Sequence, residues 1–170
     1  MRLADVNAMD RASFVAALGG VFEHSPWVAE RAFASRPFGG VDALHRSMVD
    51  AMHRASSDEQ LALVRAHPEL AGRAMVRDEL TADSASEQSG AGLTQCSPEE
   101  FARLTELNAR YGAKFGFPFI LAVKGYDRPG VIAELARRVE RDVETEFAEA
   151  LGQIARIARF RLEAKLPEGA

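Results

Sequence analysis

Apolar residues recur at spacings of three and four along almost the whole chain, and this helical period constrains the fold more than any other feature. Phe14, Ala17, Leu18 and Val21 form one such stripe near the N-terminus. The chain is therefore predicted to be all-α, a single domain over residues 1–170 with about eight to nine helices and one buried extended segment. Further segments with this period lie at residues 26–36, 44–55, 57–66, 98–115, 129–141 and 142–165.

One stretch departs from the helical period. Residues 117–123 are continuously apolar and lie between Gly116 and Gly125. A single strand would have no partner in a chain that is otherwise helical, so we interpret this stretch as a buried extended segment. Its backbone donors and acceptors then need other partners, because buried N–H and C=O groups are almost always paired. A ligand is one candidate for that partner.

Polar residues mark several of the expected helix starts. Ser97 and Glu100 flank a proline and have the spacing of a capping box, which predicts a helix start. Ser57 and Gln60 have the same spacing and predict another start. Asp142 is expected to cap the last helix, because aspartate is a favoured N-cap residue.

Composition and charge exclude several classes of function. The net charge of −4, with basic and acidic residues intermixed, provides no basic surface for nucleic acid. The single cysteine, Cys96, excludes an internal disulfide framework and fits a reducing compartment. The N-terminus is not a secretory signal, and no run approaches the about 18 apolar residues of a membrane span. We therefore expect a cytoplasmic protein of bacterial type that binds neither nucleic acid nor membrane.

His67 is the first candidate for chemistry, since it ends a predicted helix and precedes Pro68. Proline fixes the next backbone dihedral angle and so limits where the imidazole can point. With an unperturbed pKa of about 6.5, histidine is the usual proton carrier at neutral pH. The alternative is a histidine that only contacts the carbonyls of the last helical turn. The residue alone leaves both interpretations open.

A short polar segment at residues 84–88 is the second candidate. If Ser84 caps a helical turn, Glu87 is its capping-box partner, and its role is structural. Glu87 is otherwise a carboxylate available for chemistry. Gln88 offers a donor and an acceptor, which suits an amide or a urea group.

Arg161 is the third candidate, because it continues an apolar row of the last predicted helix. That row runs through Phe147, Leu151, Ile154 and Ala158. A guanidinium directed into a core needs an anionic partner, since an unpaired buried charge is costly. The partner is either a carboxylate of the protein or a carboxylate of a substrate. A third alternative is that the guanidinium, near the helix end, reaches solvent by snorkelling.

A metal site is not expected from this sequence. His45 and His53 lie eight residues apart on one predicted helix, without the four-residue spacing of a zinc protease helix. No pair of cysteines is present to assist them.

Several segments far apart in the chain together resemble the 2-oxo-4-hydroxy-4-carboxy-5-ureidoimidazoline (OHCU) decarboxylase family of the urate degradation pathway. The resemblance covers most of the chain. HPELAG at residues 67–72, SASEQ at 84–88 and KFGFPF at 114–119 are specific in combination, although none would suffice alone. The segments that carry the resemblance are residues 14–27, 67–72, 84–88, 91–93, 107–108 with 111, 114–125, 154–157 and 161–162.

The resemblance implies an all-helical homodimer that converts OHCU to (S)-allantoin and CO2 without a cofactor. It assigns His67 as the catalytic acid and Glu87 as its polar partner. A ring C=N beside the substrate carboxylate can accept the electron pair, so neither pyridoxal nor thiamine is required. The residues that it places against the substrate are Pro68, Ser84, Ala85, Ser86, Glu87, Gln88, Phe119, Ile120, Leu121, Ala122, Val123 and Arg161.

Two other functions fit the same residues. A non-catalytic helical module that binds a ureide or a purine breakdown product would use the same polar groups, and turnover separates it from an enzyme. A helical interaction protein would instead have Arg161 paired with an internal acid, and it would have no pocket between His67 and Phe119.

Overall fold

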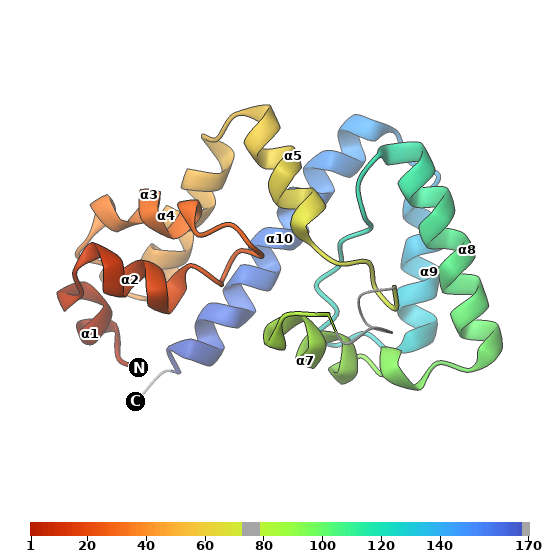
Figure 1. Cartoon of the computed structure of the whole chain (residues 1–170), viewed down its shortest axis with the longest axis horizontal. Helices are drawn as coiled ribbons and strands as arrows, with labels where there is room; N and C mark the ends of the chain where they lie inside the picture. The colour runs from red at the N-terminus through yellow and green to blue at the C-terminus, as the bar shows by residue number, and fades with distance from the viewer. Residues whose placement is uncertain (73–78, 168–170) are drawn as a thin grey trace. The chain divides into compact units, whose positions relative to one another are not determined.

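The computed structural model describes residues 1–72 and 79–167, and these residues are mainly helical (Figure 1). They contain nine α-helices, two short 3-10 helices and no strand, which confirms the all-α prediction. None of the described helices is both long and apolar enough to cross a membrane. The chain divides into two compact units, one formed by Met1–Ala66 with the residues from 155 onward and the other by His67–Ile154.

The first unit is built around Phe14. Asp10 caps the helix that carries this ring by accepting a hydrogen bond from the Ser13 amide at 2.8 Å. The Phe14 ring meets Phe33 edge-on at 5.5 Å and stacks on Phe38 at 6.2 Å. The elements of this unit are α1 (Leu3–Ala8), α2 (Arg11–Leu18), α3 (Trp27–Ala32), η1 (Phe33–Ser35), α4 (Val41–His53), α5 (Ser57–Ala66) and the C-terminal part of α10 (Val143–Lys165).

The second unit contains α7 (Ala82–Gly90), η2 (Leu93–Gln95), α8 (Pro98–Phe115), α9 (Arg128–Arg138) and the first part of α10. Helices α8 and α9 pack against each other (Figure 1). The predicted capping box at the start of α8 is confirmed, with Ser97 and Glu100 bonded reciprocally at 3.1 and 2.9 Å. Gly116 ends α8 with a φ of 74°, a left-handed conformation in which glycine avoids the steric cost of a side chain.

One predicted capping box is wrong by one residue. The Ser56 hydroxyl, not the Ser57 hydroxyl, accepts from the Glu59 amide at 3.3 Å, and Glu59 accepts from the Ser56 amide at 3.0 Å. Gln60 instead donates to the Met52 carbonyl at 3.0 Å and so satisfies the end of α4. The cap predicted for α10 is confirmed, since Asp142 accepts from the amide of the residue three positions later at 2.8 Å.

Residues 117–123 form neither helix nor strand, and all of them except the half-buried Pro118 are buried. Aromatic packing against α8 fixes the start of this segment. The Tyr111 ring lies 6.0 Å from the Phe117 ring and 5.4 Å from the Phe119 ring, edge-on in both cases. Of the predicted buried extended segment, its burial and its place outside the helices are therefore confirmed.

Candidate active site

Residues 67–72 form the loop that follows α5 and carries the predicted proton donor. His67 is only 7 % exposed, and Pro68 beside it is half-buried. Ala71 has a φ of 51°, a left-handed conformation that costs a residue with a side chain about 1–2 kcal/mol. A loop that keeps such a conformation needs contacts that hold it in place.

Gln88 of α7 provides two of these contacts. Its Oε1 accepts a hydrogen bond from the Ala71 amide at 2.9 Å, and its Nε2 donates to the Glu69 carbonyl at 3.4 Å. The loop and α7, which are separate predicted site segments, are thus joined directly. A carboxamide has two donor hydrogens and two acceptor lone pairs, so these two bonds leave Gln88 capacity for a ligand.

The cap of α7 rules out the capping-box role for Glu87. Thr81 is the N-cap residue, and its hydroxyl accepts from the Ser84 amide at 3.3 Å. Ser84 is therefore the third residue of the helix rather than its cap, and Glu87 is not a capping-box partner. Glu87 is half-buried, between the exposed Ser86 and the buried Gln88.

Asn108 links the loop at residues 67–72 to α8. Its Nδ2 donates to the Leu70 carbonyl at 2.9 Å, and the side chain is buried. Tyr111 lies three residues further along the same helix and packs against Phe119. One face of α8 therefore supports two of the predicted site segments. Asn108 belongs to a segment that carries the family resemblance, and it also interrupts the apolar row of α8, which is a usable signal in the sequence.

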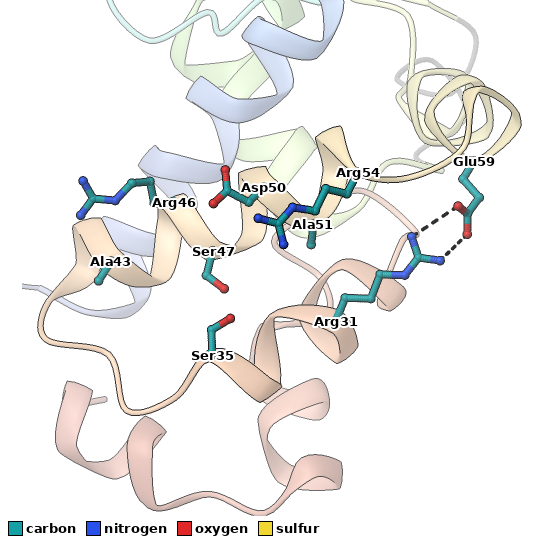
Figure 2. A pocket seen from close by; sticks show the side chains of 9 residues that line it. All are labelled: Arg31, Ser35, Ala43, Arg46, Ser47, Asp50, Ala51, Arg54 and Glu59. Atoms are coloured by element: carbon teal, nitrogen blue, oxygen red, sulfur yellow. Dashed lines mark hydrogen bonds and ion pairs between the residues drawn. The ribbon is translucent and has the colours of Figure 1, made fainter.

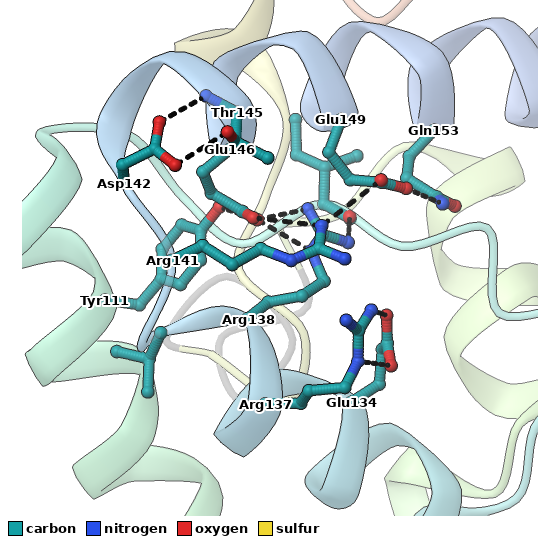
Figure 3. A network of polar contacts seen from close by, with 12 residues as sticks. Tyr111, Glu134, Arg137, Arg138, Arg141, Asp142, Thr145, Glu146, Glu149 and Gln153 are labelled. Carbon is teal, nitrogen blue, oxygen red and sulfur yellow. Dashed lines mark hydrogen bonds and ion pairs between the residues drawn. The ribbon is translucent and has the colours of Figure 1, made fainter.

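Two side chains from the helices of the second unit, Arg138 and Gln153 (Figure 3), hold the backbone of the segment 119–123. The Ala122 amide donates to Oε1 of Gln153 at 3.0 Å, and Arg138 donates from Nη1 to the Ile120 carbonyl at 2.7 Å. The sequence had left a ligand as a candidate partner for the buried backbone groups here. For these two groups the partners are protein side chains.

Arg138 belongs to a buried charged network. Its Nε and the Tyr111 hydroxyl each donate to Oε1 of Glu146 at 2.6 Å, and all three residues are fully buried. Burial, and next the hydrogen bond to the Glu146 carboxylate, raise the pKa of the Tyr111 phenol above its ordinary value. The phenol therefore remains a donor to this carboxylate.

Gln153 is held by a second acid. It donates from Nε2 to Oε1 of Glu149 at 2.7 Å, and this hydrogen bond is the main reason why the pKa of Glu149 is lowered. Arg141 adds a contact to the other oxygen of the same carboxylate at 3.3 Å. The Gln153 amide is thus fixed at both its oxygen and its nitrogen.

Sequence reasoning missed Arg138, Glu146 and Gln153. A usable signal exists on α10, where Glu146, Ala150, Gln153 and Ile157 form a buried row at spacings of four, three and four. Two polar residues on such a row indicate internal partners, by the same argument that singled out Arg161.

Arg161 lies in the first unit, whereas the other predicted site residues belong to the second. It donates from Nη1 to Oε2 of Glu23 at 2.7 Å, and both side chains are buried. Of the two anionic partners that the sequence left open, the structure therefore shows the internal carboxylate.

The first unit also contains a cavity of about 560 Å³ that includes none of the predicted site residues (Figure 2). Three arginines line it, Arg31, Arg46 and Arg54, together with Asp50 and Glu59. Arg31 is paired with Glu59 at 2.5 Å. The lining lacks the apolar wall and the histidine that the predicted chemistry requires, so we do not assign the reaction to it.

The described residues contain no group of three His, Cys, Asp or Glu side chains that could hold a metal ion. His45 donates from Nε2 to the Ala155 carbonyl at 2.8 Å, which is a structural role within the first unit.

Comparison with known proteins identifies one family over most of the chain. The family model described as OHCU decarboxylase matches residues 7–163. A Haloferax volcanii protein named OHCU decarboxylase is 44% identical over 95% of this chain and 94% of its own length. The corresponding mouse protein is 40% identical over 95% of this chain and 91% of its own length. A uric acid degradation bifunctional protein of Bacillus subtilis is 44% identical over 93% of this chain, which covers 31% of that protein.

Two solved structures are similar to the described fold. A crystal structure of (S)-allantoin synthase has a TM-score of 0.78 and 31% identity, over 98% of this chain and 54% of that chain. A structure of OHCU decarboxylase determined in the presence of (S)-allantoin has a TM-score of 0.70 over 92% of this chain and 97% of that chain. At 21% identity, the second similarity concerns the fold alone. By the family match and by its identity to full-length relatives, this chain belongs to the OHCU decarboxylase family.

Proposed function

We propose that this chain catalyses the cofactor-independent decarboxylation of OHCU to (S)-allantoin and CO2, a step of urate degradation. The observation that carries the proposal is 44% identity, over 95% of the chain, to a protein named for this decarboxylation. The hydrogen bond between Gln88 and Ala71 supports it, because it joins the loop of the proposed acid to the helix of the proposed carboxylate.

The reaction needs a place for the electron pair that CO2 leaves behind. In OHCU the ring C=N beside the carboxylate-bearing carbon accepts this pair, and an enol-like species results. Protonation of that species on one face then sets the handedness of the product. The protein therefore has to orient the substrate carboxylate, deliver one proton to one face and exclude water.

We assign the proton delivery to His67, which is buried and whose backbone is constrained by Pro68. Glu87, which is half-buried on α7 and is not the cap of that helix, orients the imidazole or holds the substrate hydroxyl. Arg161 contacts the substrate carboxylate in this proposal, in addition to Glu23. The remaining contacts come from Pro68, from residues 84–88 of α7 and from the backbone of residues 119–123.

The direct test is turnover with a handed product. Purified protein is mixed with freshly prepared OHCU, and the loss of OHCU absorbance and the circular dichroism of the allantoin formed are followed. We expect OHCU to disappear faster than its spontaneous decay in buffer and the product to be the S form. Decay at the buffer rate together with measurable binding of allantoin would instead identify a non-catalytic ureide-binding module.

We further propose that the chain works as a homodimer in the cytoplasm. The family resemblance favours the dimer, and the single cysteine fits a reducing compartment. Light scattering after gel filtration measures the first point, and fractionation of cells that express the protein measures the second.

A further inference from the structure

Leu121 lies between the two side-chain anchors of the segment 119–123. Arg138 holds the carbonyl of the residue before it at 2.7 Å, and Gln153 holds the amide of the residue after it at 3.0 Å. Both peptide bonds of Leu121 are trans, since the one cis bond among the described residues precedes Pro37. The two anchors therefore define the orientation of both peptide planes that flank this residue.

In a trans peptide the carbonyl and the following amide point in opposite directions. When Arg138 holds the Ile120 carbonyl, the Leu121 N–H points away from Arg138. When Gln153 holds the Ala122 amide, the Leu121 C=O points away from Gln153. Neither Leu121 main-chain group has a hydrogen-bond partner among the described residues, although Leu121 is only 3 % exposed. A buried donor and acceptor in this position call for a ligand.

We propose that Gln153 and Arg138 are positioning residues, which hold the Leu121 N–H and C=O toward the substrate. The proposal rests on the function proposed above and deepens it. A donor beside an acceptor on one residue complements a group that carries N–H and C=O next to each other. The imidazolone ring and the ureido arm of a ureide have this arrangement, so this backbone pair would recognise the substrate class through its amide edge.

The chemistry of the anchors favours orientation over simple stabilisation. Arg138 and Glu146 are both completely buried, and the Arg138 guanidinium also lies over the Phe119 ring, 4.6 Å from its centre. Replacing a buried ion pair with apolar residues of similar size is often neutral or even stabilising, so such a pair is weak evidence for a role in stability. An apolar neighbour could bury Leu121 equally well, but it could not fix the direction of a carbonyl or an amide.

Gln153→Met tests the first anchor, because methionine has a similar length and neither donor nor acceptor of comparable strength. We expect KM for OHCU to rise roughly ten- to a hundredfold while kcat changes much less, since the anchor positions a binding group. The matched control is Gln60→Met, which likewise removes hydrogen bonds between a glutamine side chain and the main chain, here to two carbonyls at the end of α4. The control should lower only the unfolding midpoint.

A triple variant, called the network-free variant, tests the second anchor without leaving a buried charge unpaired. Arg138→Met, Glu146→Leu and Tyr111→Phe together remove the arginine that holds Ile120 and the two groups that meet at the Glu146 carboxylate with it. Arg141, which also approaches Glu146, keeps its pairing with Glu149. We expect a folded protein whose KM for OHCU is raised and whose kcat is largely kept. This variant also decides the matter if Gln153→Met does not fold.

The outcomes are distinguishable from a failure of the proposed function. If the unmodified protein does not accelerate OHCU decay, the proposed function is wrong. If the unmodified protein is active and Gln153→Met and the network-free variant keep its KM, the positioning role is wrong. The positioning role is equally overturned if Gln60→Met raises KM as much as Gln153→Met does, because general destabilisation would then explain the effect.

Discussion

The guanidinium of Arg161 and the carboxylate of Glu23 form an ion pair at 2.7 Å inside the first unit, with 3 % and 2 % of their side chains exposed. A tight turn presents the acid. His24, the next residue, has a φ of 47°, and the Ser25 hydroxyl donates to the Glu23 carbonyl at 2.9 Å. The two residues are 138 positions apart in the sequence. The positive charge of Arg161, which stands out on the apolar row of α10, therefore has an anionic partner within the protein.

Arg161→Met should lower the free energy of unfolding by roughly 3 kcal/mol or more, because it leaves the buried Glu23 carboxylate without this partner. Urea denaturation measures the loss. The paired variant Glu23→Gln/Arg161→Met removes both charges and should recover much of the stability. Arg159→Met is the control on the same helix, since Arg159 pairs with Asp42 and Glu163 closer to solvent and each exposed pair should contribute less than about 1 kcal/mol. Equal losses at both arginines would contradict this prediction.

The substrate-binding role of Arg161 makes a separate prediction about activity. In the paired variant kcat/KM per folded molecule should fall strongly, because a charged hydrogen bond to the substrate is lost. Arg161→Lys should restore little, since an ammonium group lacks the planar fork of a guanidinium. Steady-state kinetics on protein whose folded fraction is known measures this. Unchanged kcat/KM in the paired variant would show that Arg161 does not bind the substrate.

His67→Asn should abolish most decarboxylation and leave the fold intact. Removal of a general acid typically costs a factor of about 10² to 10⁴ in rate. The backbone here is constrained by Pro68 rather than by the imidazole, so the unfolding midpoint should change little. His53→Asn is the control, because this side chain is exposed at the end of α4. A near-normal rate in His67→Asn would remove His67 from the mechanism.

Most of the fold could be predicted because helical burial is a local pattern. Residues three and four apart share a face of a helix, so the core faces of α8 and α10 were visible in the sequence. Cap positions were less certain. Ser56 and Ser57 are both competent caps, and the reach of Glu59 back to the Ser56 amide decides between them. That choice depends on side-chain geometry that spacing alone does not contain.

The candidate site was predictable in its parts but not in its internal contacts. The segments around His67 and Glu87 stood out because each has a polar group in an unusual local setting. The contact of Arg138 with Ile120 joins residues 18 positions apart across a turn of unpredicted shape. Such a pair depends on how the helices pack, and no local period encodes it.

Tyr111 provides a prediction for alkaline solution. Burial and the bond to Glu146 raise the pKa of its phenol, so the neutral form is favoured in the folded state. The stability from this bond is therefore fully present below the unfolded pKa of about 10, and it is lost as the pH rises through the higher folded value. At neutral pH, Tyr111→Phe should lower the free energy of unfolding by about 1.5–3 kcal/mol.

The pH dependence separates this bond from simple packing. The difference in unfolding free energy between the parent protein and Tyr111→Phe should be constant from neutral pH to about pH 9 and should shrink above about pH 10. Urea denaturation across this range measures it. A difference that does not shrink in alkali would mean that the lost hydroxyl acts through packing alone.

Glu87→Gln should lower turnover much more than it lowers stability. The helix that carries this residue is capped by Thr81, so neutralising Glu87 removes no capping bond. Thr81→Ala provides the comparison, because it deletes the hydroxyl that accepts from the Ser84 amide and should cost about 1 kcal/mol of unfolding free energy. Unfolding midpoints and kcat are measured on both variants.

The two variants are expected to have opposite effects on stability and on kcat. Thr81→Ala should lose stability and keep most of its kcat per folded molecule, whereas Glu87→Gln should keep its stability and lose kcat. A carboxylate that orients His67 or accepts a hydrogen bond from the substrate hydroxyl acts through its charge, which the isosteric amide lacks. If Glu87→Gln is strongly destabilised and its folded fraction turns over normally, then Glu87 supports α7 and has no part in the reaction.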